Sequence, residues 1–517
     1  MGEATTIELE NRELRAKNDV LERQLSVALR DNQLLRARLE AELRRHLGSK
    51  ADKIDPNQLE IPFEELVDAV LADSEPEPAA AVQEASDAEE APAAPTAPPK
   101  RKGAHGRKPL PANLTRVRVE HHPEDKRCAQ CQHEMQPMGS ETTEELDWQP
   151  ACFYVTEHVR VKYACRHCQE CVAIAALPPR AIEKGRPGPG LLAHVLVSKY
   201  ADHQPLHRME GILARHGIEI SRSTLCDWVR DSAQILWPIV KALKQSVLSS
   251  MVLHADATGV LCQENSRSRK TRKAQLWAWV GDKKEVVYDF TLTKEQAEPK
   301  RFLGQWSGHL QCDAASNFHQ VFESGAVIEV GCWAHARRRF VDALASDTAR
   351  ASRILALVQM LYKVEAEARE QGLDPPAKAA LRQARSRPIL ERIREEVEIA
   401  GRTVLPKSAL GDALGYVRNQ WRALNRFVED GRLAIDNNAA ERALRGVAVG
   451  RKNWLFAGSE DGGKRAATIY SLVGTCKLLG IEPFAYLRDV LERLPTHPAS
   501  RIEELTPRGW LAARATR

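Results

Sequence analysis

Three acidic residues, Asp256, Asp313 and Glu441, are the strongest candidates for chemistry in this chain. Each aspartate ends an apolar run with strand character, and Glu441 lies in the first turns of a predicted helix. The alternative interpretation of Glu441 is a surface residue that offsets the helix dipole. Carboxylates hold Mg²⁺ through a few oxygens and leave positions for a substrate. Two such ions about 3.5–4 Å apart activate an oxygen nucleophile and stabilise the leaving oxygen of a phosphodiester. The three acids therefore predict phosphoryl transfer with two Mg²⁺, or with Mn²⁺ in their place.

The elements that must position these acids are predicted to form an α/β layer. Three strands in a meander, followed by alternating helices and strands, are typical of a ribonuclease-H-like core. In that core an acid on the first strand lies beside one on the fourth, and a glutamate from a later helix completes the site. The predicted strands cover residues 251–256, 276–280, 286–290, 310–313 and 327–330, and a charged all-helical segment at 343–432 separates Asp313 from Glu441.

The helix containing Glu441 is preceded by Asp436-Asn437-Asn438, and Asp and Asn side chains commonly accept the free N–H groups of a first turn. Cations recur around the acids, and we expect them to contact phosphates. They are Arg337, Arg338 and Arg339, then Arg442 and Arg445, then Arg451 and Lys452. Cys332 and His335 have ligand-like spacing without a second pair, which favours a packed thiol and a hydrogen-bonded histidine.

Two CxxC pairs predict a structural zinc site. Cys128 and Cys131 form one knuckle and Cys165 and Cys168 the other, with Cys171 as an alternative ligand at the second. Four thiolates complete a tetrahedral zinc and leave no open position. The segment between the pairs alternates like strands, as in a zinc ribbon.

Three helices are predicted at 191–200, 206–216 and 223–236, with a short turn containing Gly217 and Ser221 between the last two. This is the pattern of a helix-turn-helix, which would place Arg222, Ser223 and Thr224 at the start of a recognition helix. An ordinary helical hairpin fits the pattern equally well.

The N-terminal region predicts a parallel coiled-coil dimer, because apolar residues and Asn recur every seven positions across residues 7–47. A solitary packed helix is the alternative. Residues 51–99 contain 13 acids and one base, so this segment carries a charge of −12. Because the net charge of the chain is +5, the remaining residues carry +17. This basic remainder suits a polyanion such as nucleic acid. The chain shows neither a signal segment nor an apolar run of membrane-spanning length, so we expect no membrane partner and an intracellular location.

Five ordered motifs resemble those of the IS66 family of bacterial insertion-sequence transposases. They are His254-Ala255-Asp256-Ala257-Thr258, Leu310-Gln311-Cys312-Asp313, the segment 332–340, the segment 436–445, and Gly450-Arg451-Lys452-Asn453-Trp454. Two neighbouring positions differ from the usual pattern. Ala257-Thr258-Gly259 stands where members carry a second acid and Thr-Pro, and Ala314-Ala315 stands where they carry Gly-Tyr.

The resemblance implies a DNA transposase that binds terminal inverted repeats and performs metal-dependent strand cleavage and strand transfer, with Asp256, Asp313 and Glu441 as the metal-binding triad. The predicted coiled coil indicates a homodimer or a higher oligomer. Accessory proteins encoded by the element are possible further partners, and the expected location is the bacterial cytoplasm at the nucleoid. The alternative is a non-catalytic DNA-binding regulator or a decayed transposase copy.

The predicted fold class is a multidomain α+β protein. Its expected parts are a coiled-coil helix (1–50), an acidic linker with a basic arm (51–106), a zinc-binding domain (107–185), a helix-turn-helix region (186–245), a first core segment (246–342), a helical insertion (343–432), a last core segment (433–497) and a tail (498–517).

Overall fold

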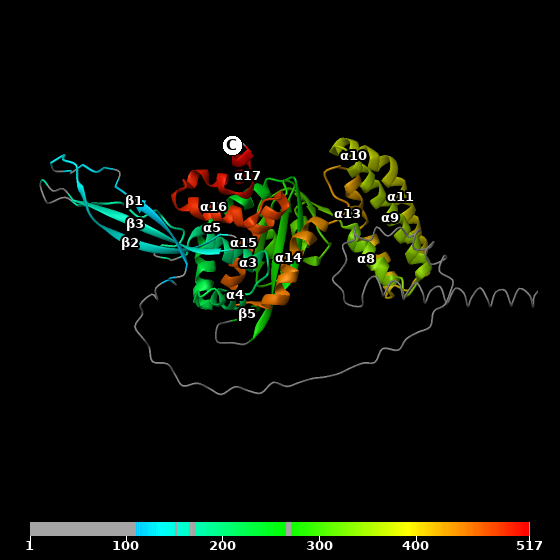
Figure 1. Ribbon diagram of the computed structural model, residues 1–517. Helices are drawn as coiled ribbons and strands as arrows, with labels where there is room; N and C mark the ends of the chain where they lie inside the picture. The colour runs from blue at the N-terminus through cyan, green and yellow to red at the C-terminus, as the bar shows by residue number, and fades with distance from the viewer. Residues whose placement is uncertain are drawn as a thin grey trace, which may run out of the picture. The chain divides into compact units, whose positions relative to one another are not determined.

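The computed structural model describes residues 110–264 and 270–515, apart from positions 111, 113, 124, 128, 130, 150–151, 165–166, 168–171, 184 and 186. The predicted coiled coil and acidic linker lie outside these residues, as do Cys128, Cys165, Cys168 and Cys171. Within the described part of the chain, no helix combines the length and the apolar character that crossing a bilayer requires. The described protein is a mixture of α-helices and two β-sheets (Figure 1).

The smaller sheet contains β1 (Thr115–His121), β2 (Gln136–Gln149), β3 (Cys152–Ala164) and β4 (Val172–Ile174). Its central strand β3 is antiparallel to β2 and β4 and parallel to β1. Asp147 near the end of β2 joins this sheet to the next helix, because its carboxylate accepts the Leu191 N–H at 2.7 Å and the Tyr154 hydroxyl at 3.0 Å. The strands predicted between the CxxC pairs are therefore present.

Three helices follow, α3 (Pro189–Tyr200), α4 (Leu206–Arg215) and α5 (Arg222–Leu248). The predicted end of the third helix at residue 236 is wrong, because α5 continues through Pro238 for three further turns. An internal proline costs a helix about 3 kcal/mol. Burial of the apolar side chains beyond it, Ile239, Val240, Leu243 and Val247, offsets that cost.

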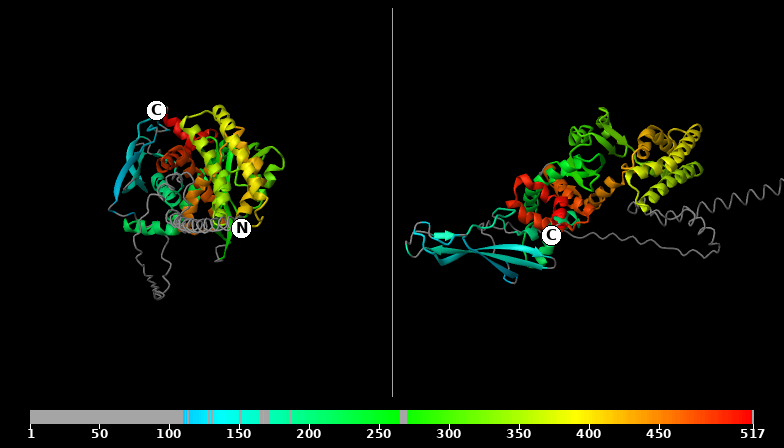
Figure 2. Two further views of the ribbon diagram at one scale, coloured as in Figure 1. Left: turned by 90° about the vertical axis from the view of Figure 1, so that its right-hand side faces the viewer. Right: turned by 90° about the horizontal axis from the view of Figure 1, so that it is seen from above.

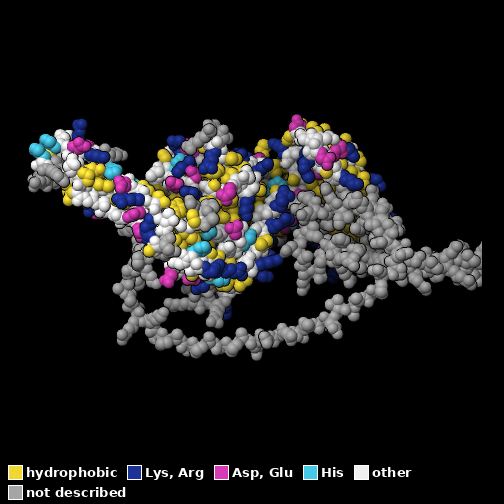
Figure 3. Space-filling model, in the orientation of Figure 1, with side chains coloured by type: hydrophobic (Ala, Val, Ile, Leu, Met, Phe, Trp, Pro, Cys, Tyr) yellow, Lys and Arg dark blue, Asp and Glu magenta, His cyan; other side chains and the backbone are white. Residues whose placement is uncertain are grey.

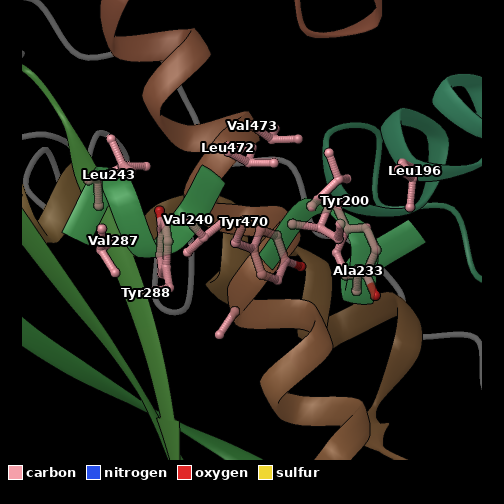
Figure 4. Close-up of a cluster of buried hydrophobic side chains, with 14 of the residues drawn as sticks. Leu196, Tyr200, Ala233, Val240, Leu243, Val287, Tyr288, Tyr470, Leu472 and Val473 are labelled. Atoms are coloured by element: carbon pink, nitrogen blue, oxygen red, sulfur yellow. The ribbon is translucent and has the colours of Figure 1, made fainter. Parts of the chain in front are cut away.

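Figure 4 shows where this apolar face goes: Val240 and Leu243 of α5 lie near Val287 and Tyr288 of a strand and Tyr470 of a later helix. The Tyr470 ring is close to both Tyr200, at 5.1 Å between ring centroids, and Tyr288, at 5.7 Å. Helices α3 and α5 are thereby built into the same core as the larger sheet.

The larger sheet has the order β7-β6-β5-β8-β9, with β10 paired to the far part of β5. Strands β5, β6 and β7 form an antiparallel meander, whereas β5, β8 and β9 are parallel. Their bounds are β5 Val252–Gln263, β6 Thr271–Gly281, β7 Val286–Thr291, β8 Gly308–Gln311, β9 Val327–Val330 and β10 Phe456–Ala457. The predicted strands are present, but the first was expected to end at Asp256 and instead continues for seven residues.

Helices surround this sheet and complete the core. Helix α15 packs on β7 and α14 lies along β5 (Figure 1). The bounds are α6 Ala297–Leu303, α7 His319–Phe322, α8 Trp333–Ala343, α14 Asn438–Trp454, α15 Glu460–Leu479, α16 Pro483–Arg493 and α17 Pro507–Ala515, with short 3₁₀ helices at 316–318, 494–496 and 499–505.

The predicted helical segment between Asp313 and Glu441 forms a separate apolar cluster around Val358, Leu361, Ile393 and Leu414. Its helices run close to one another in both views of Figure 2. They are α9 Thr348–Glu370, α10 Pro375–Leu381, a π-helical turn Arg382–Ser386, α11 Arg387–Gly401, α12 Ala409–Asn419, α13 Trp421–Asn425 and a 3₁₀ turn Arg426–Val428.

Candidate active site

Strand register sets Asp256 of β5 and Asp313, just after β8, at corresponding positions along two neighbouring chain segments. His254 of β5 is the parallel partner of Gln311, the last residue of β8. Each aspartate lies two residues further along its own chain. Asp256 is therefore within a strand that continues beside β6, whereas Asp313 begins the loop after β8. Because β8 ends at Gln311, the space beside Asp256 is not filled by a strand. Ligand sites of parallel sheets commonly lie at the carboxyl ends of strands in this way.

The three acids interact electrostatically. Burial, followed by the charges of Asp313 and Glu441, raises the pKa of Asp256 to about 7, while a hydrogen bond from the Ala257 N–H acts in the opposite direction. The charges of Asp313 and Glu441 both act on Asp256, which indicates that the three predicted acids lie in the same region of the protein.

Helix α14 begins in a different way from the prediction. Asn437 occupies the N-cap position, but its side chain caps no helical N–H. Its amide instead donates to the Ala255 carbonyl of β5 at 2.8 Å, and its oxygen lies 3.3 Å from Nδ1 of His254. Asp436 supplies the local capping, since it accepts the Asn438 N–H at 3.1 Å. Asn437 thus ties the start of the Glu441 helix to the strand that contains Asp256.

Glu441 is held between two residues of α8. Its Oε1 lies 3.5 Å from Nδ1 of His335, and its Oε2 lies 3.7 Å from the guanidinium of Arg338. Burial lowers the pKa of His335, while the charges of Glu441 and Asp313 act to raise it. Among the described residues, buried Oε1 of Glu441 has no hydrogen-bond partner. This oxygen is available to an additional ligand.

His335 also lies 3.2 Å from Sγ of Cys332, a fully buried thiol. The prediction of a packed thiol beside a hydrogen-bonded histidine is confirmed. The closeness of both to Glu441 was missed, because no local pattern connects residues on either side of the helical insertion.

The donor set fits magnesium. Three carboxylates supply hard oxygens, one of them a buried oxygen without a hydrogen bond, and the charges of Asp313 and Glu441 add to burial in raising the pKa of Asp256. A divalent cation among them would stabilise the ionised form of all three.

Basic side chains border the acids. Arg442 and Arg445 are exposed on α14, and Lys452 is exposed further along the helix. Figure 3 shows Lys and Arg side chains gathered around the position that α14 has in Figure 1. Besides Arg338, which faces Glu441, other predicted phosphate contacts also have partners within the protein: Arg451 donates to the Gly259 carbonyl at 2.7 Å, and Arg339 stacks on the Tyr416 ring at 4.5 Å. Arg337 is half-buried.

The loop after Asp313 is strained. Ala314 has a positive φ of 60°, a conformation in which glycine is favoured. This is one of the two places where the sequence differs from the motifs of the resemblance described above.

We expect Ala314→Gly to stabilise the protein by about 1 kcal/mol, because a left-handed conformation costs an L-residue about 1–2 kcal/mol. The matched control is Ala315→Gly, since Ala315 has φ −69° and the change there should destabilise by about 0.5–1 kcal/mol. Urea denaturation followed by circular dichroism measures both. Equal effects at the two positions would contradict the assignment of strain to Ala314.

Asn437→Ala should destabilise the protein by about 1–3 kcal/mol, because it leaves the buried Ala255 carbonyl without its donor. Asn425→Ala is the control: its side chain is half-buried and donates within its own short helix, so about 1 kcal/mol is expected. Tryptophan fluorescence reports unfolding, because Trp277 and Trp279 are buried in β6 of the same sheet. If Asn437→Ala lowered the free energy of unfolding no more than Asn425→Ala, a stabilising role of the hydrogen bond between Asn437 and Ala255 would be contradicted.

The turn before α5 contains the glycine and the serine cap that the sequence predicts. Gly217 has φ 75°, and the Ser221 hydroxyl accepts the Thr224 N–H. The hydroxyls of Ser223 and Thr224 lie 2.8 and 3.0 Å from that of Ser221. Arg222 is exposed beside them.

At the predicted zinc knuckles the structure describes Cys131. Its sulfur lies near ring nitrogens of His133 and His167, with all three ligand atoms within 4.8 Å of one another, and the two imidazoles stack at 4.0 Å. The sequence prediction counted thiols alone and missed these histidines.

Comparisons with known proteins agree with this architecture. Residues 184–465 match the family model described as "Transposase IS66 family". Residues 125–169 match a "zinc-finger binding domain of transposase IS66", residues 471–508 an "IS66 C-terminal element", and residues 34–119 the "Transposase C of IS166 homeodomain" model.

The chain also resembles uncharacterized proteins of Sinorhizobium fredii (strain NBRC 101917 / NGR234). It is 33% identical to y4jD over 420 residues, which cover 78% of this chain and 82% of that protein. It is 37% identical to y4qI over 388 residues, or 72% of this chain and 71% of that protein.

The matches indicate a transposase, the zinc-finger match indicates zinc, and the transposase and DNA-binding models imply DNA as a partner. The model that matches at 184–465 covers more than half of the chain, including all three acids and the helical segment between them. The chain belongs to the IS66 transposase family.

Proposed function

We propose that this protein is a DDE transposase that cleaves DNA at the ends of an insertion sequence and joins the freed 3′ ends to target DNA. The observation that supports the proposal is the electrostatic effect of both Asp313 and Glu441 on Asp256, together with the exposed arginines of α14. The order of this sheet, an antiparallel meander extended by two parallel strands, supports a ribonuclease-H-like core.

Asp256, Asp313 and Glu441 would hold two Mg²⁺, or Mn²⁺ in their place. When bound, the ions supply activation of the attacking oxygen and stabilisation of the leaving oxygen. His335 and Arg338 keep the Glu441 carboxylate in place, and Asn437 fixes its helix to β5. Arg442 and Arg445 are placed to contact phosphates of the same DNA strand.

The remaining parts serve DNA recognition and pairing of chains. The zinc domain (107–185) and the helix-turn-helix region (186–245) bind the terminal inverted repeats. The coiled coil predicted at residues 1–50 joins two chains, so that each transposon end meets one catalytic core. The linker with its basic arm (51–106) connects that dimer to the core segments (246–342 and 433–497), the helical insertion (343–432) and the tail (498–517). Accessory proteins of the element and a nucleoid location in the bacterial cytoplasm complete the proposal.

The test is cleavage of a duplex carrying the element's own terminal repeat, which is identified as paired inverted repeats flanking the coding region. We expect nicks at the repeat boundary that require Mg²⁺ or Mn²⁺, followed by joined products when target DNA is added. DNA binding without cleavage under either ion would favour the non-catalytic regulator or a decayed copy. The strained Ala314 beside Asp313 is a feature that a decayed copy would explain. Nicks without joined products would indicate a nuclease.

Arg222→Ala should weaken repeat binding and lower the slope of log K against log salt by about 1, because Arg222 is exposed at the start of the proposed recognition helix. Arg230→Ala on the same helix is the control, since that guanidinium is paired with Asp227 at 2.5 Å and Asp231 at 2.8 Å. Fluorescence anisotropy at several salt concentrations measures both variants. Unchanged affinity for Arg222→Ala would refute this contact.

A further inference from the structure

Cys332, His335 and Glu441 present a different ligand chemistry from the three acids. Cys332 immediately precedes α8, His335 lies in its first turn, and Glu441 comes from α14. Nδ1 of His335 is 3.2 Å from the Cys332 sulfur and 3.5 Å from Oε1 of Glu441, and the three ligand atoms lie within 4.8 Å of one another. Ligand atoms around a tetrahedral zinc ion, with bonds of about 2.0–2.3 Å, lie roughly 3.3–3.8 Å apart.

We propose that Cys332, His335 and Glu441 form a binding site for a thiophilic transition-metal ion of the zinc class. One sulfur, one imidazole nitrogen and one carboxylate oxygen form an open three-ligand set, to which water adds a fourth ligand. The site shares Glu441 with the acidic triad but takes its other ligands from α8.

The surroundings of each ligand support this assignment. The Cys332 sulfur accepts the Asn437 N–H at 3.1 Å, a contact that would also stabilise a thiolate. Oε1 of Glu441, the oxygen facing His335, is buried without a hydrogen bond among the described residues. Arg338 faces the other oxygen, Oε2, so an ion at Oε1 would leave that ion pair intact.

The buried thiol makes the site selective. Cys332 is fully buried, so forming a thiolate there costs free energy, and the thiol releases its proton to solvent when an ion binds the sulfur. Ions with strong affinity for sulfur, such as Zn²⁺, Cd²⁺ and Co²⁺, can offset that cost, whereas Mg²⁺ and Mn²⁺ prefer oxygen. If the proposed transposase function holds, on which this consequence rests, such an ion withdraws Glu441 from the acidic triad and inhibits strand cleavage.

The experiment is a Co²⁺ titration of the full chain, followed by thiolate-to-cobalt charge-transfer absorption in the near-ultraviolet. Wild type should bind one Co²⁺ more than Cys332→Ser and one more than His335→Ala, while the zinc-finger thiols contribute equally to all three. Cys476→Ser, which changes another buried thiol in α15, is the matched control and should bind as wild type does. Cadmium NMR separates the signals, because a ligand set with one sulfur differs in shift from a sulfur-rich knuckle.

Two of the variants separate loss of the metal site from loss of the fold or of cleavage. His335→Ala tests the site without changing the buried sulfur, and circular dichroism verifies that each variant is folded. Asp313→Asn should still bind the additional Co²⁺, because Asp313 is not one of its three ligands. Binding of this ion can therefore be measured in a variant that has lost Mg²⁺-dependent cleavage, which separates this proposal from the proposed function. Equal numbers of bound Co²⁺ in wild type, Cys332→Ser and His335→Ala would overturn the proposal, whatever the result for cleavage.

Discussion

Asp313→Asn should reduce Mg²⁺-dependent cleavage of a terminal-repeat duplex on the order of 10⁴-fold, the range found when a single essential group is removed. The amide has the shape of the carboxylate but lacks its charge, and Asp313 is among the charges that raise the pKa of Asp256. A neutral side chain at this position would weaken the hold on a divalent cation while leaving the fold intact. Gel-resolved nicking of an end-labelled duplex, under single-turnover conditions, measures the effect.

Asp289→Asn is the matched control. Asp289 is half-buried on β7 of the same sheet and pairs with Arg301 at 3.2 Å, so its loss removes a sheet carboxylate away from the triad. Cleavage by this variant should stay close to that of wild type. If Asp313→Asn kept wild-type activity, the assignment of the triad would be wrong, even with full DNA binding.

Arg382→Ala should destabilise the protein by about 3–5 kcal/mol, the cost of breaking a buried ion pair by removing one partner. Because Glu365 keeps a contact with Lys378 at 3.2 Å, we expect the lower end of this range. Arg382 is fully buried in the π-helical turn of the helical insertion, and its guanidinium contacts the carboxylate of Glu365 at 2.6 and 2.7 Å. It also donates to the carbonyls of Phe427 at 2.5 Å and Leu433 at 3.0 Å. The side chain therefore fixes the segment that leads from the insertion to the Glu441 helix. Urea denaturation measures the free energy of unfolding.

Arg385→Ala is the control from the same turn, because Arg385 pairs with Glu367 while remaining exposed. Exposed pairs contribute about 0–1 kcal/mol. Similar losses for the two variants would show that the buried pair has no special role. Because Arg382 holds the chain just before α14, its variant should also cleave DNA more slowly than its loss of stability alone explains.

Much of the site could be predicted from local sequence. Asp256 and Asp313 each come directly after an apolar run in the sequence, and the parallel pairing of β5 with β8 sets the two runs side by side. The length of the first strand could not be predicted locally, because β5 continues past Asp256 only where β6 pairs with it along the full hairpin. The third helix was cut short for a similar reason, since the burial that carries α5 through Pro238 comes from β7 and α15.

The roles of single side chains at the Glu441 helix depended on partners distant in sequence. Asn437 has the chemistry of an N-cap, but the buried Ala255 carbonyl needs a donor, and Asn437 supplies it while Asp436 caps the helix. His335 and Cys332 showed their spacing in the sequence, but their third neighbour, Glu441, comes from beyond the helical insertion.

By itself, the sequence determined the kinds of ligand, the order of the elements and the family pattern, because side-chain chemistry and hydrophobic periodicity are local properties. The tertiary structure decided which of those groups meet. Strand register set Asp313 beside Asp256, and the packing of α8 and α14 brought a thiol, an imidazole and an unpaired carboxylate oxygen to one point. Contacts between residues far apart in the chain form only when burial of the core compensates the entropy lost in closing the segments between them.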